Sequence, residues 1–93
     1  MPAPGPALVI AIRAPIARSD LPGLCRRVCG LIESSVPEVV VCDVVSVDAD
    51  GVAVDALARL QLGARRRGCV VRLRGASDEL RELVQFVGLG EVL

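Results

Sequence analysis

Hydrophobic positions in this chain follow two patterns, short β-branched runs and longer stretches with helical spacing. The runs cover 7–13, 38–45 and 69–73, and each is rich in valine or isoleucine. Runs of this length and composition predict β-strands. In 7–13 and 38–45 the apolar residues are nearly continuous, so we expect these two strands to be covered on both faces, as central parallel strands are.

The polar and apolar residues between and after these runs predict amphipathic helices, because apolar residues recur three and four positions apart. One helix is predicted over 20–34 and a second over about 51–67. A third begins after Ser77 and ends at Gly88, and an apolar segment follows that can fold back onto the core. Strand 38–45, an acidic loop, the second helix and the third strand together predict a right-handed βαβ unit.

The second predicted helix has two distinct sides when its residues are placed 100° apart. The side expected to face the sheet consists of Ala53, Val54, Leu57, Leu60 and Ala64. The opposite side consists of Val52, Asp55, Arg59, Leu62 and Arg66. Asp55 and Arg59 form an i,i+4 pair in the favourable orientation. Two apolar residues, Val52 and Leu62, are thus predicted to lie among charged residues on the outer side.

Length and composition indicate one folded domain that carries no net charge. The chain has 93 residues, of which 53% are hydrophobic and 24% charged, a globular rather than a disordered composition. Eleven basic residues balance eleven acidic ones, so no net charge steers it toward nucleic acid. Phe86 is the only aromatic residue, and stacking platforms for single-stranded nucleic acid are therefore missing. We expect no nucleic-acid partner.

No apolar run approaches the roughly 20 residues that a membrane-spanning helix needs. Residues 1–6 form a Pro/Gly-rich stretch without a basic region before it, which is typical of a flexible leader and not of a signal peptide. We therefore expect a cytoplasmic protein that does not insert into a membrane.

The cysteines and the absence of histidine argue against a metal site and against catalysis. Cys25 and Cys29 are one helical turn apart, while Cys42 and Cys69 belong to strands. No C-x₂-C pair occurs, so we expect four reduced, unmetallated thiols that behave as small hydrophobes. No histidine can act as a general base, and no phosphate-binding glycine motif is present. The sequence predicts a protein that is not an enzyme and carries no cofactor.

Asp43 is the one charged residue inside the run 38–45. One hypothesis is that its carboxylate supports the loop at the carboxyl end of the strand. The other is that it reaches solvent or caps backbone amides there, as aspartate commonly does. The two roles are compatible.

Three features together resemble the STAS domain, the module shared by sulfate transporters and anti-sigma factor antagonists. They are Asp43 near the end of a Val-rich strand, Asp50 at the opening of the following helix, and Gly-Leu before the last apolar residues. The resemblance covers nearly the whole chain. It implies an α/β fold in one domain, 1–93, with a small mixed sheet, a parallel βαβ core and about three to four flanking helices.

The helix opening differs from the STAS pattern at the position that regulates many members. In the family an Asp-Ser-Ser-Gly motif opens this helix, and its second serine is phosphorylated. A gapless alignment places Asp50 at the first position, Gly51 at the first serine and Val52 at the second. Val52 has no hydroxyl, so the resemblance implies no phosphorylation there.

A shifted alignment pairs residues 48–51 with the motif and makes Asp50 a built-in negative charge at the phosphorylated position. It would also turn Asp55 toward the sheet, and burying an unpaired carboxylate is costly. We prefer the gapless alignment for this reason.

The resemblance implies a regulatory protein that acts by binding an anti-sigma factor of the serine-kinase type. The alternative is a small cytoplasmic STAS subunit of an ABC-type lipid transporter, which would contact the ATPase, and a homodimer is compatible with either role. The predicted docking surface comprises Ser46, Asp48, Asp50, Gly51, Val52, Asp55, Arg59, Leu62 and Arg66.

Overall fold

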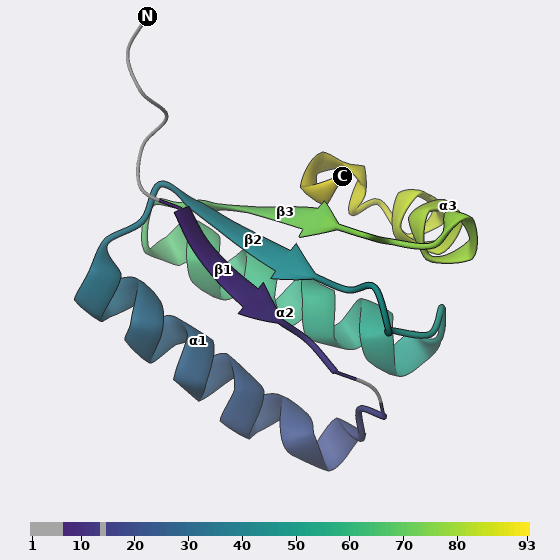
Figure 1. Ribbon diagram of the computed structural model, residues 1–93, viewed down its shortest axis with the longest axis horizontal. Helices are drawn as coiled ribbons and strands as arrows, with labels where there is room; N and C mark the ends of the chain where they lie inside the picture. Colours follow the sequence, from purple (N-terminus) through teal and green to yellow (C-terminus); the bar gives the residue numbers. More distant parts are fainter. Residues whose placement is uncertain (1–6, 14) are drawn as a thin grey trace, which may run out of the picture.

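The computed structural model describes residues 7–13 and 15–93. The flexible leader predicted for residues 1–6 lies outside the described residues. Three strands form one sheet in the order β1-β2-β3, and both neighbouring pairs are parallel (Figure 1). The strands are β1 (Ala7–Ala11), β2 (Val39–Asp43) and β3 (Val70–Arg74).

Helices connect the strands and close the fold. In chain order they are the 3₁₀ turn η1 (Arg18–Asp20), α1 (Leu21–Ser35), α2 (Gly51–Arg66), α3 (Asp78–Phe86) and the 3₁₀ turn η2 (Gly90–Val92). The predicted βαβ core is confirmed, because β2 and β3 are adjacent and parallel and α2 joins them. The described sheet is entirely parallel, so the mixed sheet is wrong for this part of the chain. A helix separates each pair of strands, and such a crossover returns the chain in the same direction, whereas a hairpin would reverse it.

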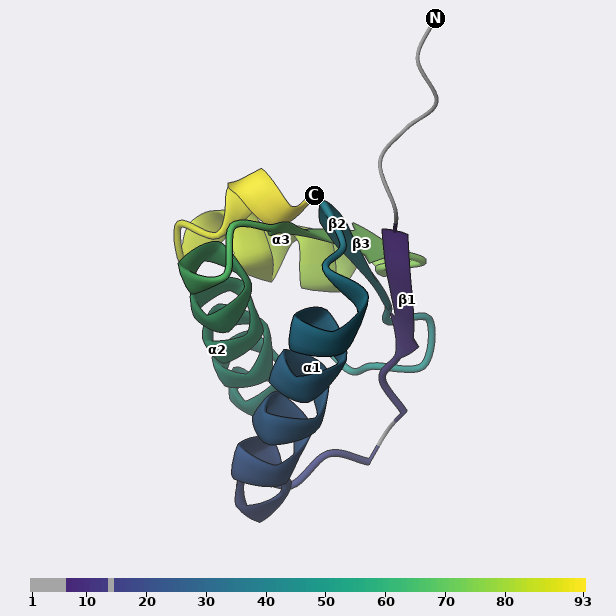
Figure 2. The ribbon, with the colours of Figure 1, turned by 90° about the vertical axis from the view of Figure 1, so that its left-hand side faces the viewer.

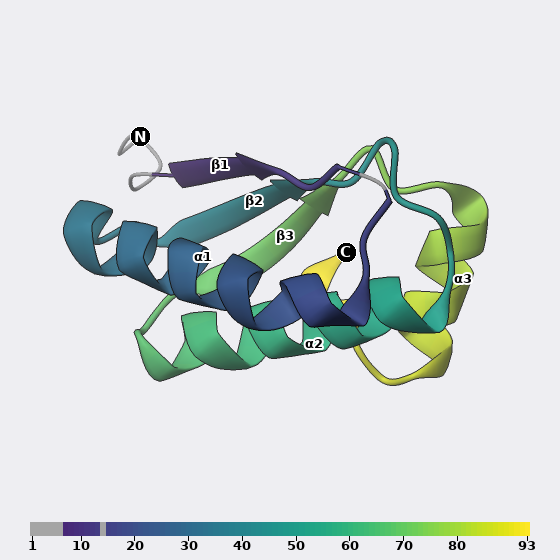
Figure 3. The same ribbon diagram turned by 90° about the horizontal axis from the view of Figure 1, so that it is seen from below.

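Among the described residues, helices cover only one face of the sheet. Figures 1, 2 and 3 show α1 and α2 side by side on that face. Along β2, Val40 and Cys42 point inward and are fully buried, whereas Val39 and Val41 are partly exposed. The prediction that the first two strands are covered on both faces is therefore wrong. Both crossovers pass on the same side, which leaves the other side without a helix among the described elements.

We call this uncovered side the open face. Its residues are Ala7, Val9, Ala11, Val39, Val41, Asp43, Val70, Arg72 and Arg74. The parallel register aligns them in rows, so that Val9, Val41 and Arg72 lie across from one another. Six of the nine are alanine or valine; of the charged ones, Asp43 and Arg74 lie in the last row and Arg72 lies in the middle row.

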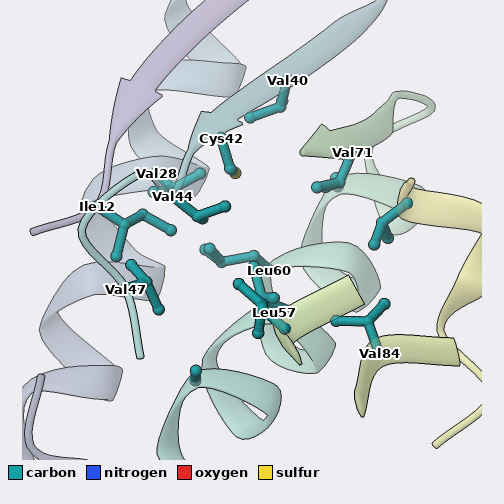
Figure 4. Packing of buried hydrophobic residues seen from close by; sticks show 14 of the residues in the cluster. Ile12, Val28, Val40, Cys42, Val44, Val47, Leu57, Leu60, Val71 and Val84 are labelled. Carbon is teal, nitrogen blue, oxygen red and sulfur yellow. The ribbon is translucent and has the colours of Figure 1, made fainter. Parts of the chain in front are cut away.

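The core lies between the sheet and the helices, and strand, α2 and α3 residues meet in it (Figure 4). The predicted inner side of α2 is confirmed for Ala53, Leu57, Leu60 and Ala64, which are buried, while Val54 is half-buried. Burial of these apolar side chains is the main contribution to the stability of such a fold.

The predicted stops and the closing segment are also confirmed. Gly68 and Gly88 follow α2 and α3 with φ of 78° and 87°, a left-handed conformation that glycine adopts without a steric penalty. Val92 is fully buried in η2, so the last residues fold back onto the core. Within residues 7–13 and 15–93, no helix combines the length and the apolarity that crossing a bilayer requires.

Candidate protein-binding surface

Asp43 performs both of the roles considered for it. Its Oδ1 accepts a hydrogen bond from the Val45 N–H at 3.2 Å, and its Oδ2 accepts one from Arg74 Nη2 at 3.2 Å. The Val45 N–H and the Arg74 guanidinium lower the pKa of the Asp43 carboxyl, because both stabilise its charged form. The carboxylate thus caps a backbone amide and holds the start of the loop that leads to α2.

That loop, 44–50, is anchored by buried valines and presents polar residues. Val44 and Val47 are buried, and the Val47 N–H donates to the Val44 carbonyl at 3.0 Å. Ser46 and Asp48 are exposed between and after them. The loop also borders a cleft whose other wall is the start of α3, and this cleft is lined by Val45, Ser46, Val47, Asp48, Ala49, Ser77, Asp78 and Glu79.

Asp50 caps α2. Its backbone is extended, and its Oδ1 accepts a hydrogen bond from the Ala53 N–H at 2.9 Å. Gly51 is the first helical residue, and Val52 after it is half-buried. The Asp50 carboxylate is therefore engaged in capping the helix, and Val52 contributes less exposed apolar surface than the helix wheel predicted.

Asp55 lies on the flank of α2 that faces the start of α1 and not toward the sheet. Arg18 Nη1 is 3.0 Å from Asp55 Oδ2, and Arg59 Nε is 2.8 Å from Asp55 Oδ1. This orientation agrees with the helix wheel, which placed Asp55 on the outer side of the helix. The predicted pair between Asp55 and Arg59 is confirmed, and Arg18 is a partner that the local pattern did not indicate.

Leu62 and Arg66, at the C-terminal end of the predicted docking surface, are both exposed to solvent. Leu62 is 53% exposed. Arg66 is exposed and takes part in none of the ion pairs among the described residues. The structure therefore places an acidic loop at one end of α2, an ion-paired cluster in the middle, and an apolar residue beside an arginine farther along.

No protein-family model, curated protein or solved structure matches the chain significantly.

The helix wheel contained a signal for one further residue, Gln61. It lies four positions after Leu57 and so shares the inner side of α2, where it is 6% exposed. Its side-chain N–H donates to Glu91, which also pairs with Arg65 at 3.1 Å. Gln61 Oε1 is buried and accepts no hydrogen bond among the described residues. These contacts tie the closing segment to α2.

We expect Asp50→Ala to lower the free energy of unfolding by about 1 kcal/mol, because the Ala53 N–H loses its acceptor. Asp50→Ser should retain most of the stability, since serine is also a good N-cap. Asp48→Ala serves as the matched control, because Asp48 is an exposed loop residue two positions earlier. Urea unfolding checks this prediction, and equal losses for the Asp48 and Asp50 variants would contradict it.

The four cysteines are free thiols of unequal exposure. Burial raises the pKa of the Cys42 thiol to about 11, which leaves roughly one thiolate in a thousand at pH 8. We expect Ellman's reagent at pH 8 to modify the half-buried Cys25 and Cys29 first and Cys42 only after unfolding. Mass spectrometry of partly modified protein checks the order. Early modification of Cys42 in the native protein would contradict it.

Proposed function

We propose that this chain is a cytoplasmic regulatory binding protein, similar to STAS-type anti-sigma factor antagonists, and that it binds an anti-sigma factor of the serine-kinase type. The observation that carries the proposal is the exposed Leu62 on α2 beside Arg66, which forms no ion pair with any residue of 7–13 or 15–93. Apolar anchors with arginine among them are the usual composition of a binding hot spot. Binding of this kind requires no catalytic residue.

The charges around this anchor support recognition of a protein partner. Asp48 and the neighbouring acidic residues of the cleft lie beside the N-terminal end of α2, and basic residues follow toward its C-terminal end. A partner with the opposite arrangement of charges would be oriented along the helix, since charge complementarity fixes the register of a complex.

Phosphorylation at the family position does not regulate this interaction in our proposal. Val52 provides no hydroxyl, and the Asp50 carboxylate is bonded to the Ala53 N–H. Binding is then not switched by phosphorylation at this position.

Affinity capture from the native host followed by mass spectrometry tests the proposal. We expect an anti-sigma factor with a kinase fold to be retained by the wild-type protein and released by excess untagged protein. Retention of a transporter ATPase would instead support the lipid-transporter role and reject the anti-sigma assignment. Retention of neither class would reject both.

A further inference from the structure

The open face is unusual for a parallel sheet. Parallel sheets occur almost only with both faces covered, yet among the described elements α1 and α2 lie side by side on the same side of the sheet (Figure 3). Val9 on the edge strand β1 is 52% exposed, and Val70 on the opposite edge strand is 43% exposed. Covering an apolar surface of this kind with another apolar surface lowers the free energy, because both are removed from water.

The same chain carries an exposed aromatic residue on a short acidic helix. Phe86, the only aromatic side chain, is 88% exposed at the end of α3. Glu79 and Glu82 precede it by seven and four positions, so the three lie on one stripe of the helix. Both glutamates are exposed and take part in none of the ion pairs among the described residues.

We propose that α3 of one molecule docks on the open face of a second copy of this chain. The two surfaces are complementary in charge: the acidic stripe of α3 faces β3, where Arg74 pairs with Asp43 and Arg72 donates only to the neutral backbone carbonyls of Val71 and Glu91, so that the face keeps a net positive charge. Phe86 enters the valine-rich part of the face. The contact joins two different surfaces, so it is head-to-tail and not face-to-face.

The spacings of the two surfaces also agree. At 1.5 Å per residue, Glu82 lies about 6 Å and Glu79 about 10 Å along the helix from Phe86. At 3.3 Å per residue, Arg72 lies about 7 Å and Arg74 about 13 Å along β3 from Val70. With Phe86 above Val70, each glutamate thus comes within side-chain reach of one arginine.

The size of the contact sets its strength. A nine-residue helix is about 13 Å long, and the five-residue strands are about 16 Å long, so α3 covers most of the face. One short helix buries less than the roughly 800 Å² per partner of a stable interface. We therefore expect weak association, with a dissociation constant in the range of about 10 μM to 1 mM.

Because α2 lies on the other side of the sheet, its outer residues stay exposed in the assembly (Figure 2).

Sedimentation equilibrium of the purified chain from about 10 μM to 1 mM tests this proposal. The wild-type average mass should rise above the 9.7 kDa of one chain. Phe86→Ser and Val9→Asp should each abolish the rise, because one removes the helix anchor and the other disrupts the face. Val36→Asp is the control: this valine is 75% exposed but lies outside both surfaces, and its variant should associate like wild type.

Mixing the two defective variants provides the decisive result. Phe86→Ser retains an intact face and Val9→Asp retains an intact α3, so the mixture should form a one-to-one heterodimer although neither variant self-associates. If Val9→Asp does not fold by circular dichroism, Val70→Asp replaces it on the other edge of the face. A monomeric wild type, a mixture that stays monomeric, or variants that associate like wild type would each overturn the proposal.

Discussion

Leu57→Ala is expected to lower the free energy of unfolding by about 2–5 kcal/mol, the range for truncating a buried leucine. Leu57 is 1% exposed and belongs to the cluster that joins α2 to the sheet and α3. Its removal loses apolar burial and leaves a cavity that the surrounding side chains fill only in part. A small domain has a total stability of about 5–15 kcal/mol, so the loss is a large part of it.

Leu62→Ala is the matched control for this substitution, since it removes the same atoms from the same helix on the exposed side. We expect its effect to stay within about 0.5 kcal/mol. Urea unfolding followed by circular dichroism measures both variants, and similar costs at the two positions would show that the assignment of the inner and outer sides of α2 is wrong.

Gly63→Val is expected to lower the free energy of unfolding by about 1–3 kcal/mol through overpacking between α1 and α2. A Cβ at Gly63 would lie 3.0 Å from the Cys29 Sγ of the neighbouring helix. Gly30→Val is the matched control, because nothing lies within 4 Å of a Cβ at that position on α1. The control should be neutral or slightly stabilising, since valine forms helices better than glycine.

Removal of the opposing sulfur should rescue the first of these variants. Gly63→Val combined with Cys29→Ala is expected to be more stable than the two separate effects predict, with a coupling of about 0.5–3 kcal/mol. Thermal unfolding of the four members of the cycle measures this coupling. Strict additivity would contradict the close approach of the two helices at Gly63.

The order of the elements could be predicted because local patterns determine it. The β-branched runs gave the strands, and Gly68 and Gly88 gave the ends of α2 and α3. The inner side of α2 followed from helical spacing, and Gln61 would have followed from the same wheel. Asp50 as the cap of α2 was indicated by its position before an apolar-periodic segment.

The open face and the partner of Asp55 could not be predicted in this way. Valine alternates with valine along β2, so the run 38–45 does not show which valines are buried and which are exposed. Arg18 and Asp55 are separated by 37 positions, and only the packing of α1 against α2 brings them together. Both features depend on the tertiary arrangement, which cannot be deduced from local periodicity.

The docking role of α2 is tested most directly by isothermal titration of the captured partner against the wild-type protein and Leu62→Asp. Leu31→Asp is the matched control, because this leucine is 40% exposed on α1 outside the predicted docking surface. We predict that Leu62→Asp weakens binding at least tenfold, about 1.4 kcal/mol, while Leu31→Asp binds like wild type and both variants keep the wild-type circular dichroism spectrum. Unchanged affinity of the folded Leu62→Asp variant would contradict the account.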